Sequence, residues 1–424
     1  MNRKERPHVL VLGAGFGGLR ACQALRDAPV RITVVDRQNH HLFQPLLYQV
    51  ATAGLSATEV AQPIRSILAE QANASVVLGE VESVDLASRE VTLKDGPLRY
   101  DYLIIALGGA TSYFGHPEWE AYAPGLKSLE DAIRIRSRAL LAFEKAEVSS
   151  DANERRRLMT VVVVGGGPTG VELAGAFAEL SRHVLQSEFR RIDPATAHVV
   201  LIEAGPRILA HLPKALSDSA VEQLTSLGVE VRTATRVLSI SDRRVELESG
   251  ILEAETIVWA AGVGANALTQ ELGVPLDRAG RIVVEPSLAL SEHPEVFAIG
   301  DIASVKDQHG KPVPGVSPAA MQMADHVGRI VAREISGDTS SGHRPAFRYW
   351  DKGTMATIGR SAAVAKMGRL EWSGLPAWLA WLGVHLVFLV GFRNKIAVFL
   401  QWVYSYCTYR RGARVVVSDE TESR

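Results

Sequence analysis

Apolar runs and glycine-rich turns alternate with helix-forming stretches along this chain, and one such arrangement opens it. Residues 8–12 form a mostly apolar run that predicts a buried strand, and glycines at 13, 15, 17 and 18 separate this run from a helical stretch to about residue 25. The next apolar run, 30–35, ends at Asp36. A strand, a glycine turn, a helix and a second strand in this order are typical of a parallel sheet with right-handed crossovers.

The same arrangement recurs 152 positions later (165 − 13). The β-branched run 160–164 predicts a strand, a glycine turn and helix start follow it, and the run 198–202 predicts a strand that ends at Glu203. The segment 181–197 has a helical, charged pattern. Further strands are expected at 102–106, 229–232, 256–259 and 296–299. The pattern predicts an α/β fold with two Rossmann-like dinucleotide-binding domains.

Composition excludes several classes of function. Of 424 residues, 46 are basic and 47 acidic, and the formal net charge of −1 provides no basic field for nucleic acid. Cys22 and Cys407 are the only cysteines, which excludes a disulfide framework, a cysteine-rich zinc site and a C-x-x-C redox pair. His40 and His41 have no neighbouring cysteine or acidic cluster, so we expect no metal site. Glycines interrupt the first apolar run, so we expect no secretion signal.

The first glycine turn has the residues that a dinucleotide requires. Gly13 permits the tight turn, Gly15 permits close approach of a pyrophosphate to backbone N–H groups, and Gly18 permits close packing of helix on strand. Asp36 lies at a strand end 23 positions after Gly13, where a carboxylate can accept hydrogen bonds from ribose hydroxyls. A plain helix-capping turn is the alternative, but the flanking strands and the acid favour dinucleotide binding.

The second turn repeats these features with Gly165, Gly167 and Gly170. Its acid is Glu203, 38 positions after Gly165, so the intervening segment is longer than usual. A carboxylate there repels a 2′-phosphate and favours NADH, although Arg207 nearby keeps NADPH as an alternative. Two dinucleotide units in one chain suggest that a nicotinamide passes a hydride to a flavin.

A further glycine–acid pair and the C-terminal region add to this interpretation. Gly300 and Asp301 end an apolar run, where the carboxylate can reach flavin phosphate or ribitol hydroxyls; an ordinary turn is the alternative. The segment 372–392 contains no charged residue, and 372–417 contains five basic and no acidic residues. Four of the seven tryptophans lie beyond residue 370. This pattern favours a segment that lies on a lipid surface, with a single membrane span or a buried dimer contact as alternatives.

These motifs together resemble a known family. The two glycine turns, the Gly300–Asp301 pair and the segment 260–262 are similar to those of the two-dinucleotide-binding-domain flavoproteins. Within that superfamily, the chain resembles the type II NADH:quinone oxidoreductases from about residue 8 to 415. The stretches that carry this likeness are 43–51, 54–56, 165–174, 351–353 and the tryptophan- and arginine-rich tail.

The resemblance implies a split domain organisation. FAD would bind a domain formed by residues 1–115 and 289–345, and NADH would bind residues 116–288. A C-terminal helical region, 346–424, would attach to the membrane through about 372–412. Asp36, Gln44, Gly262, Gly300 and Asp301 would contribute to cofactor binding along with the two glycine turns and Glu203.

The resemblance also implies the catalytic residues. Glu172 would lie near the nicotinamide and flavin, with a surface acid at a helix start as the alternative. Gln322 would bind a quinone carbonyl or the flavin edge, and Lys352 would stabilise a developing quinol oxyanion or relay a proton. The family's Ala-Gln-x-Ala-x-Gln segment reads Ser317-Pro318-Ala-Ala-Met-Gln322 here, so its first glutamine has no counterpart, and we expect Pro318 to reshape the mouth of the quinone site.

The expected activity is therefore transfer of a hydride from NADH to FAD and of two electrons to a membrane quinone, without proton pumping. The enzyme would be peripheral on the cytoplasmic face of the inner membrane, with a homodimer left open. Two alternatives remain: a reductase of another acceptor, such as an iron–sulfur protein, and a nicotinamide-sensing flavoprotein with little turnover.

Overall fold

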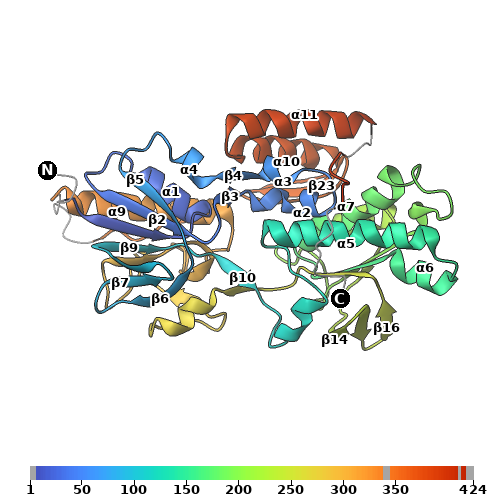
Figure 1. Cartoon of the computed structure of the whole chain (residues 1–424), viewed down its shortest axis with the longest axis horizontal. Coiled ribbons are helices and arrows are strands. Elements are labelled where there is room, and N and C mark those ends of the chain that lie inside the picture. The colour runs from blue at the N-terminus through green and yellow to red at the C-terminus, as the bar shows by residue number, and fades with distance from the viewer. Residues whose placement is uncertain (1–5, 338–343, 409–411, 417–424) are drawn as a thin grey trace. The chain divides into compact units, whose positions relative to one another are not determined.

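The computed structural model describes residues 6–337, 344–408 and 412–416. The chain divides into two units that are each made of several segments, and Figure 1 labels their helices and strands. The first unit comprises residues 1–42, 61–110 and 263–352, and the second comprises residues 43–60, 111–262 and 353–424. Residues 43–60, which we expected within the first part of the FAD-binding domain, thus belong to the second unit.

The first unit is built on a five-stranded parallel sheet in the order β20-β9-β1-β2-β5, of which Figure 1 labels β2, β5 and β9. Its central strand β1 is buried throughout, as expected where helices or further sheet cover both faces. The strands are β1 (His8–Leu12), β2 (Arg31–Asp36), β5 (Ala74–Leu78), β9 (Tyr102–Ile105) and β20 (Val296–Ala298), and the main helices are α1 (Phe16–Ala24) and α9 (Ser317–Ile335). Smaller elements are β3 (His40–Leu42), β4 (Ala61–Pro63), α4 (Ile64–Ile67), β6 (Val81–Asp85), β7 (Glu90–Leu93), β8 (Gly96–Arg99), β19 (Ile282–Val283) and β21 (Ala303–Ser304).

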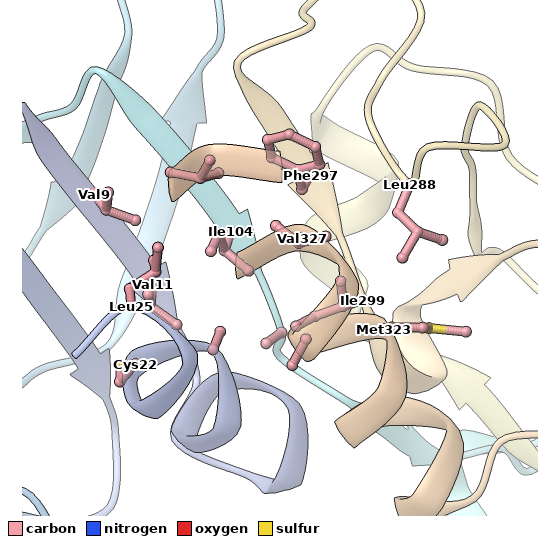
Figure 2. Packing of buried hydrophobic residues seen from close by; sticks show 14 of the residues in the cluster. Val9, Val11, Cys22, Leu25, Ile104, Leu288, Phe297, Ile299, Met323 and Val327 are labelled. Carbon is pink, nitrogen blue, oxygen red and sulfur yellow. The ribbon is translucent and has the colours of Figure 1, made fainter. Parts of the chain in front are cut away.

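Alternate residues of β1 enter two different cores of this unit. Val9 and Val11 pack with side chains of α1 and α9, whereas Leu10 and Leu12 pack with residues of β6 and β7 on the other side of the sheet. Figure 2 shows Val9 and Val11 on the same side of the sheet as Val327 of α9. Burial of each such side chain stabilises the fold by about 1.5–3 kcal/mol. The unit is therefore held from both faces of one central strand.

The second unit contains the second predicted repeat. Its parallel sheet has the order β13-β12-β11-β17, and the same unit contains an antiparallel sheet in the order β14-β15-β16. The strands are β11 (Thr160–Val164), β12 (His198–Ile202), β13 (Val229–Arg232), β14 (Val237–Ser241), β15 (Arg244–Leu247), β16 (Gly250–Glu253) and β17 (Thr256–Trp259). The helices are α2 (Leu47–Ala51), α3 (Ala57–Val60), α5 (Leu129–Val148), α6 (Ala152–Leu158), α7 (Pro168–Glu179) and α8 (Lys214–Ser226).

The C-terminal region packs within the second unit. It forms an antiparallel sheet of β22 (Thr354–Gly359), β23 (Ala362–Met367) and β24 (Leu370–Ser373), followed by α10 (Leu375–Phe388) and α11 (Phe392–Thr408). Gly175 lets α7 approach β22 closely, because a Cβ atom there would lie 1.7 Å from the carbonyl oxygen of Ile358. Within the described residues, no helix is both long enough and apolar enough to cross a membrane, so the single span that we kept as an alternative is not found.

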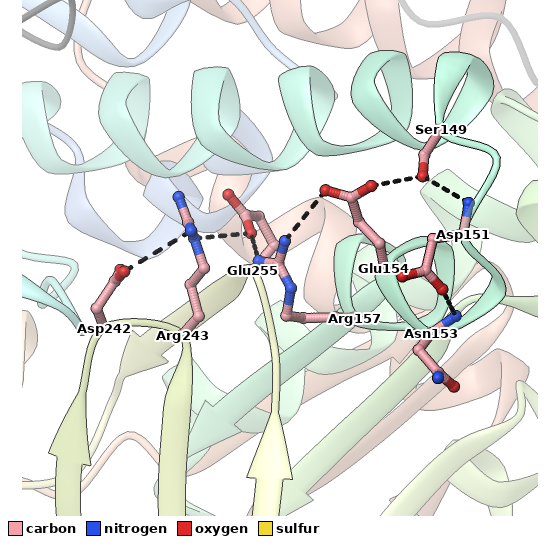
Figure 3. A network of polar contacts seen from close by, with 8 residues as sticks. All are labelled: Ser149, Asp151, Asn153, Glu154, Arg157, Asp242, Arg243 and Glu255. Atoms are coloured by element: carbon pink, nitrogen blue, oxygen red, sulfur yellow. Dashed lines mark hydrogen bonds and ion pairs between the residues drawn. The ribbon is translucent and has the colours of Figure 1, made fainter.

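A network of ion pairs joins α6 to the strands beside it (Figure 3). The carboxylate of Glu255, which directly precedes β17 and is 8% exposed, pairs with Arg157 of α6 and, at 3.2 Å, with Arg243 between β14 and β15. Arg157 also lies 3.7 Å from Glu154. Because two guanidinium groups compensate the buried Glu255 charge, removal of this carboxylate would leave them without their shared partner.

One sequence expectation was wrong. The segment 181–197 does not form the charged helix that its pattern suggested: α7 widens into a π-helical turn at Leu180–Val184, and only a 3-10 turn at Pro194–Thr196 follows. Asp193 begins that 3-10 turn, since its side chain accepts a hydrogen bond from the N–H of Ala195. A proline directly after a capping acid starts a new turn rather than continuing a helix.

Candidate active site

In the first glycine turn, the fold leaves no room for a side chain at two positions and leaves space beside a third glycine that lies between them. Gly13 has a φ of +92°, and a Cβ atom there would lie 2.5 Å from the carbonyl oxygen of Ala106. A Cβ atom on Gly18 would lie 1.7 Å from the carbonyl oxygen of Gly13. Nothing lies within 4 Å of the corresponding point on Gly15. The backbone at Gly15 is therefore open to a ligand at the start of α1, where a pyrophosphate is favoured.

The second turn reproduces this geometry. Gly165 has a φ of +114°, and a Cβ atom on Gly170 would lie 1.8 Å from the carbonyl oxygen of Gly165. The space beside Gly167 is again open within 4 Å. Both turns thus fit the diphosphate of a dinucleotide, by the same combination of tight packing and one open glycine.

The two acids hold equivalent positions. Asp36 accepts a hydrogen bond from the loop N–H of Ala14 at 2.6 Å, and Glu203 accepts one from Gly166 at 2.6 Å. In each case the second oxygen accepts the N–H of the residue two positions further on. Each carboxylate oxygen keeps a lone pair, so ribose hydroxyls can still donate to it.

The other four expected cofactor residues, Gly300, Asp301, Gly262 and Gln44, lie outside the two glycine turns. Gly300 has a φ of +77° and begins a 3-10 turn that contains Asp301. The backbone of Gly315 comes close to that acid, because a Cβ atom there would lie 3.1 Å from its Oδ1. Gly262, in the second unit, has a φ of +82° and packs against Phe114. Gln44 is exposed in the second unit and donates to the carbonyl of Lys127 at 3.3 Å.

The structure brings Gln322 and Lys352 together in the first unit. The Gln322 amide forms two hydrogen bonds with the backbone of Trp350: its Oε1 accepts at 2.9 Å and its Nε2 donates at 3.0 Å. The Lys352 ammonium lies 5.6 Å from the centre of the exposed Trp350 ring, within cation–π range. Pro318 lies in the first turn of α9, where its missing N–H costs nothing.

Glu172 lines a cavity of about 60 Å³ in the second unit. Side chains of α2, α7, the β22 region and α11 form its wall, among them Tyr48, Gln49, Glu179, Trp402, Ser405 and Tyr406. The cavity thus joins residues from four segments that are far apart in the sequence. Two carboxylic acids, two phenols and an indole line the same small space.

Burial keeps the Glu172 carboxyl protonated. A small part of the residue is accessible, yet protein atoms surround the carboxyl closely, and this desolvation raises its pKa to about 8. The N–H of Thr357, which donates to Oε1 at 3.3 Å, and the indole of Trp381 lower the pKa and offset part of the shift. The Trp381 N–H has no described partner in hydrogen-bonding geometry, so we assign its effect to the indole dipole. At neutral pH, Glu172 is therefore a proton donor.

Comparison with known proteins identifies the family. Residues 7–324 match the family model described as pyridine nucleotide-disulphide oxidoreductase, and residues 351–411 match the NDH2 C-terminal domain. The type II NADH:quinone oxidoreductase Ndh of Mycobacterium tuberculosis is 42% identical over 99% of this chain and 92% of that protein. The chain belongs to the type II NADH:quinone oxidoreductase family.

Other relatives agree with this membership. NdhA of Mycobacterium tuberculosis, also a type II NADH:quinone oxidoreductase, is 42% identical over 99% of this chain and 91% of that protein. The solved structure of NDH2 from Plasmodium falciparum in complex with NADH has a TM-score of 0.88 at 21% identity and covers 98% of this chain and 100% of that one. The predicted α/β fold is thereby confirmed.

The cysteines of this family member form no redox disulfide. Cys22 is fully buried, and burial raises the pKa of its thiol to about 12, while Cys407 is exposed on α11; both are free. Among the described residues, no cluster of His, Cys, Asp or Glu could hold a metal ion.

Sequence reasoning missed the residues that share the cavity with Glu172. Tyr48 and Gln49 belong to a stretch that carried the family resemblance, but no role was assigned to either. Trp402 was noted only as part of a tryptophan-rich tail. The signal available was a polar residue, Gln49, within an otherwise apolar and aromatic run that is buried from Leu46 to Ala51.

Proposed function

We propose that the chain transfers a hydride from NADH to FAD and two electrons onward to a membrane quinone. FAD binds the glycine turn of the first unit, and NADH binds that of the second, where Glu203 favours a free 2′-hydroxyl. Family membership supports the activity. The observation that carries the quinone step is the cavity beneath α11, in which Glu172 holds a proton at neutral pH.

The proton balance explains why a protonated acid is useful. Reduction of a quinone to a quinol takes two electrons and two protons, whereas oxidation of NADH to NAD⁺ yields two electrons and one proton. One further proton must come from solvent through the protein. FAD, when bound, accepts the hydride and passes the electrons on. Glu172 is suited to give a proton to a quinone oxygen and to regain it from water, because its pKa lies near the working pH.

Gln322 and Lys352 have supporting roles in this proposal. The Gln322 amide keeps one N–H free beyond its two bonds to the Trp350 backbone, and that N–H can bind a carbonyl oxygen. The Lys352 ammonium provides positive charge for a developing oxyanion. Glu172 belongs to the second unit and these two residues to the first.

The C-terminal helices supply the contact with the membrane. Large apolar side chains of α10 and α11 are exposed, namely Leu379, Val387, Phe399, Leu400 and Val403. Arg393 is exposed at the start of α11, and the basic residues at 410 and 411 lie outside the described residues. Apolar side chains beside cations are suited to an anionic lipid surface. We place the enzyme peripherally on the cytoplasmic face of the inner membrane, as the family resemblance implies, and a homodimer contact is the alternative use of these exposed side chains.

Steady-state turnover tests the function. Purified, FAD-loaded protein is given NADH or NADPH with a short-chain quinone, or with ferricyanide, which accepts electrons without protons. We expect rapid quinone reduction with NADH and slower reduction with NADPH. Glu172→Gln should slow quinone reduction by roughly 100-fold and leave ferricyanide reduction unchanged. The control is Arg20→Gln, which alters the equivalent position of the first repeat.

The same assay separates the other functions. Rapid ferricyanide reduction with no quinone reduction in the wild type would favour a different acceptor, such as an iron–sulfur protein. Tight NADH binding with little turnover on either acceptor would favour a sensor. Equal quinone turnover in wild type and Glu172→Gln would contradict the proposed role of Glu172 but not the proposed function.

A further inference from the structure

A chain of hydrogen bonds leads from α11 to the wall of the cavity. The indole Nε1 of Trp402 donates to Oε1 of Gln49 at 2.9 Å, and Nε2 of Gln49 donates to the hydroxyl oxygen of Tyr48 at 2.8 Å. All three side chains are buried: Trp402 is 5% exposed, Gln49 8% and Tyr48 6%. One buried hydrogen bond thus joins Gln49 and Trp402, which are 353 positions apart in the sequence, and a second extends the chain to Tyr48.

The direction of each hydrogen bond follows from the chemistry of the indole. An indole N–H can only donate, so Gln49 must present its carbonyl oxygen to Trp402 and its NH₂ group to Tyr48. The Tyr48 oxygen therefore accepts, and its own hydrogen must point elsewhere. Among the described residues, no acceptor receives this hydrogen.

Tyr48 lines the same cavity as Glu172. Burial, and then the charge that Glu172 carries when ionised, raise the pKa of Tyr48 well above its usual value, so the phenol stays protonated. The groups that face it are Glu172 and Glu179 of α7, Tyr406 of α11 and Gln49 of α2. None of these is a cation, and Arg360, the cation that also lines the cavity, is not among the groups that shift the pKa of Tyr48.

We propose that Tyr48 donates a hydrogen bond to an oxygen of the quinone in this cavity, and that Gln49 and Trp402 are positioning residues that turn the Tyr48 hydroxyl toward it. The inference rests on the proposed quinone reductase function. It adds a second donor beside Glu172, and it gives α11 a role in the site in addition to its exposed apolar side chains. A carbonyl oxygen has two lone pairs, so it can accept from both groups.

The first test separates the two half-reactions of Tyr48→Phe in anaerobic stopped-flow experiments. We expect the rate of flavin reduction by NADH and the oxidation by ferricyanide to equal those of the wild type. Reoxidation by a short-chain quinone should be slower by about tenfold, the loss of one hydrogen bond to a polar partner. A reoxidation rate equal to that of the wild type would overturn the inference.

The second test addresses the positioning residues. Gln49→Leu and Trp402→Phe should each reproduce part of the Tyr48→Phe defect, mainly as a higher KM for quinone. Because both act through Tyr48, the double variant Trp402→Phe/Tyr48→Phe should be no slower than Tyr48→Phe alone. Losses that multiply in the double variant would overturn the coupling. Trp119→Phe is the matched control, since Trp119 is 6% exposed and belongs to the same unit but does not line the cavity.

A spectroscopic readout makes the test independent of turnover. The infrared carbonyl stretch of a ¹³C-labelled quinone bound to the oxidised enzyme should shift to lower frequency in the wild type and shift less in Tyr48→Phe. An identical stretch in the two proteins would overturn the inference. Failure of the wild type itself to be reoxidised by quinone would overturn the proposed function, which distinguishes the two failures.

Discussion

The two repeats share their turns but differ in the helix that follows each turn. In both, the third glycine is packed against the carbonyl oxygen of the first, at 1.7 Å in one repeat and 1.8 Å in the other for an added Cβ atom. In both, the acid at the end of the next strand accepts a loop N–H at 2.6 Å. The offset of 152 residues pairs Arg20 of α1 with Glu172 of α7 (172 − 152 = 20).

These equivalent positions have opposite surroundings. Arg20 forms an ion pair with Asp325 of α9 at 2.7 Å, and the two side chains are 42% and 31% exposed. Glu172 instead has its carboxyl enclosed by protein and protonated at neutral pH. The glycine turn determines that a dinucleotide can bind. The packing around the helix that follows the turn determines what chemistry the residue at the position of Arg20 or Glu172 can perform.

The largest expected effects lie in the glycine turns. Gly18→Ala forces a Cβ atom against a backbone oxygen and should lower the free energy of unfolding by about 3 kcal/mol or more. Gly15→Ala meets no neighbour in the protein and should cost about 1 kcal/mol or less, as a helix N-cap substitution, while FAD content falls sharply. Chemical denaturation and flavin absorbance measure both. Retention of full FAD content in Gly15→Ala would contradict FAD binding at the first turn.

Removal of the carboxylate at the centre of the buried ion network should have the next largest effect on stability. Glu255→Ala leaves Arg157 and Arg243 without their shared carboxylate and should cost about 2–3 kcal/mol, less than a fully buried pair because Arg243 is half-exposed. Urea denaturation measures the change. A cost no larger than that of a surface ion pair would show that solvent already compensates these charges.

The protonated state of Glu172 makes a signed prediction about pH. Its pKa of about 8 in the folded protein exceeds the ordinary value of 4.5, so between these two values the folded state holds a proton that the unfolded state has lost. Stability should therefore fall as pH rises through this window and level off above it, by about 1 kcal/mol from about pH 6 to pH 7. Glu172→Gln should remove this slope, as measured by Tm at several pH values. An unchanged slope in Glu172→Gln would mean that the wild-type carboxyl is already ionised at neutral pH.

The smallest effect belongs to the equivalent residue of the first repeat. Arg20→Gln removes a partly exposed ion pair and should cost about 0–1 kcal/mol, with no change in the slope of stability against pH. The loss should shrink further at high salt. A large, pH-dependent loss of stability in Arg20→Gln would contradict the contrast between α1 and α7.

The two repeats could be predicted from the sequence because each of their strands is specified by residues that are close together in the chain. Strands at 8–12, 160–164, 198–202, 229–232 and 256–259 form at the predicted residues, since short apolar runs next to glycine turns specify them. The prediction of a helix over 181–197 was wrong although the composition of this segment is typical of a helix. A π-helical turn ends α7 at Leu180–Val184, and Pro194 begins a separate 3-10 turn.

The cavity could not be predicted from local patterns. It joins Tyr48, Glu172, Thr357 and Trp402, and only tertiary packing brings α2, α7, β22 and α11 around one carboxyl. The raised pKa of Glu172 has the same origin, because desolvation depends on neighbours that sequence spacing does not reveal. The assignments of the site residues to cofactor or quinone, those of Gln44, Gln322 and Lys352 among them, remain predictions.

Anaerobic rapid mixing of the FAD-loaded wild-type protein tests the central claim most directly. The protein is first mixed with one equivalent of NADH while flavin absorbance is followed, and a short-chain quinone is then added. We predict fast bleaching of the flavin, followed by fast recovery with stoichiometric formation of quinol. Bleaching that quinone fails to reverse, or no bleaching despite bound NADH, would contradict it.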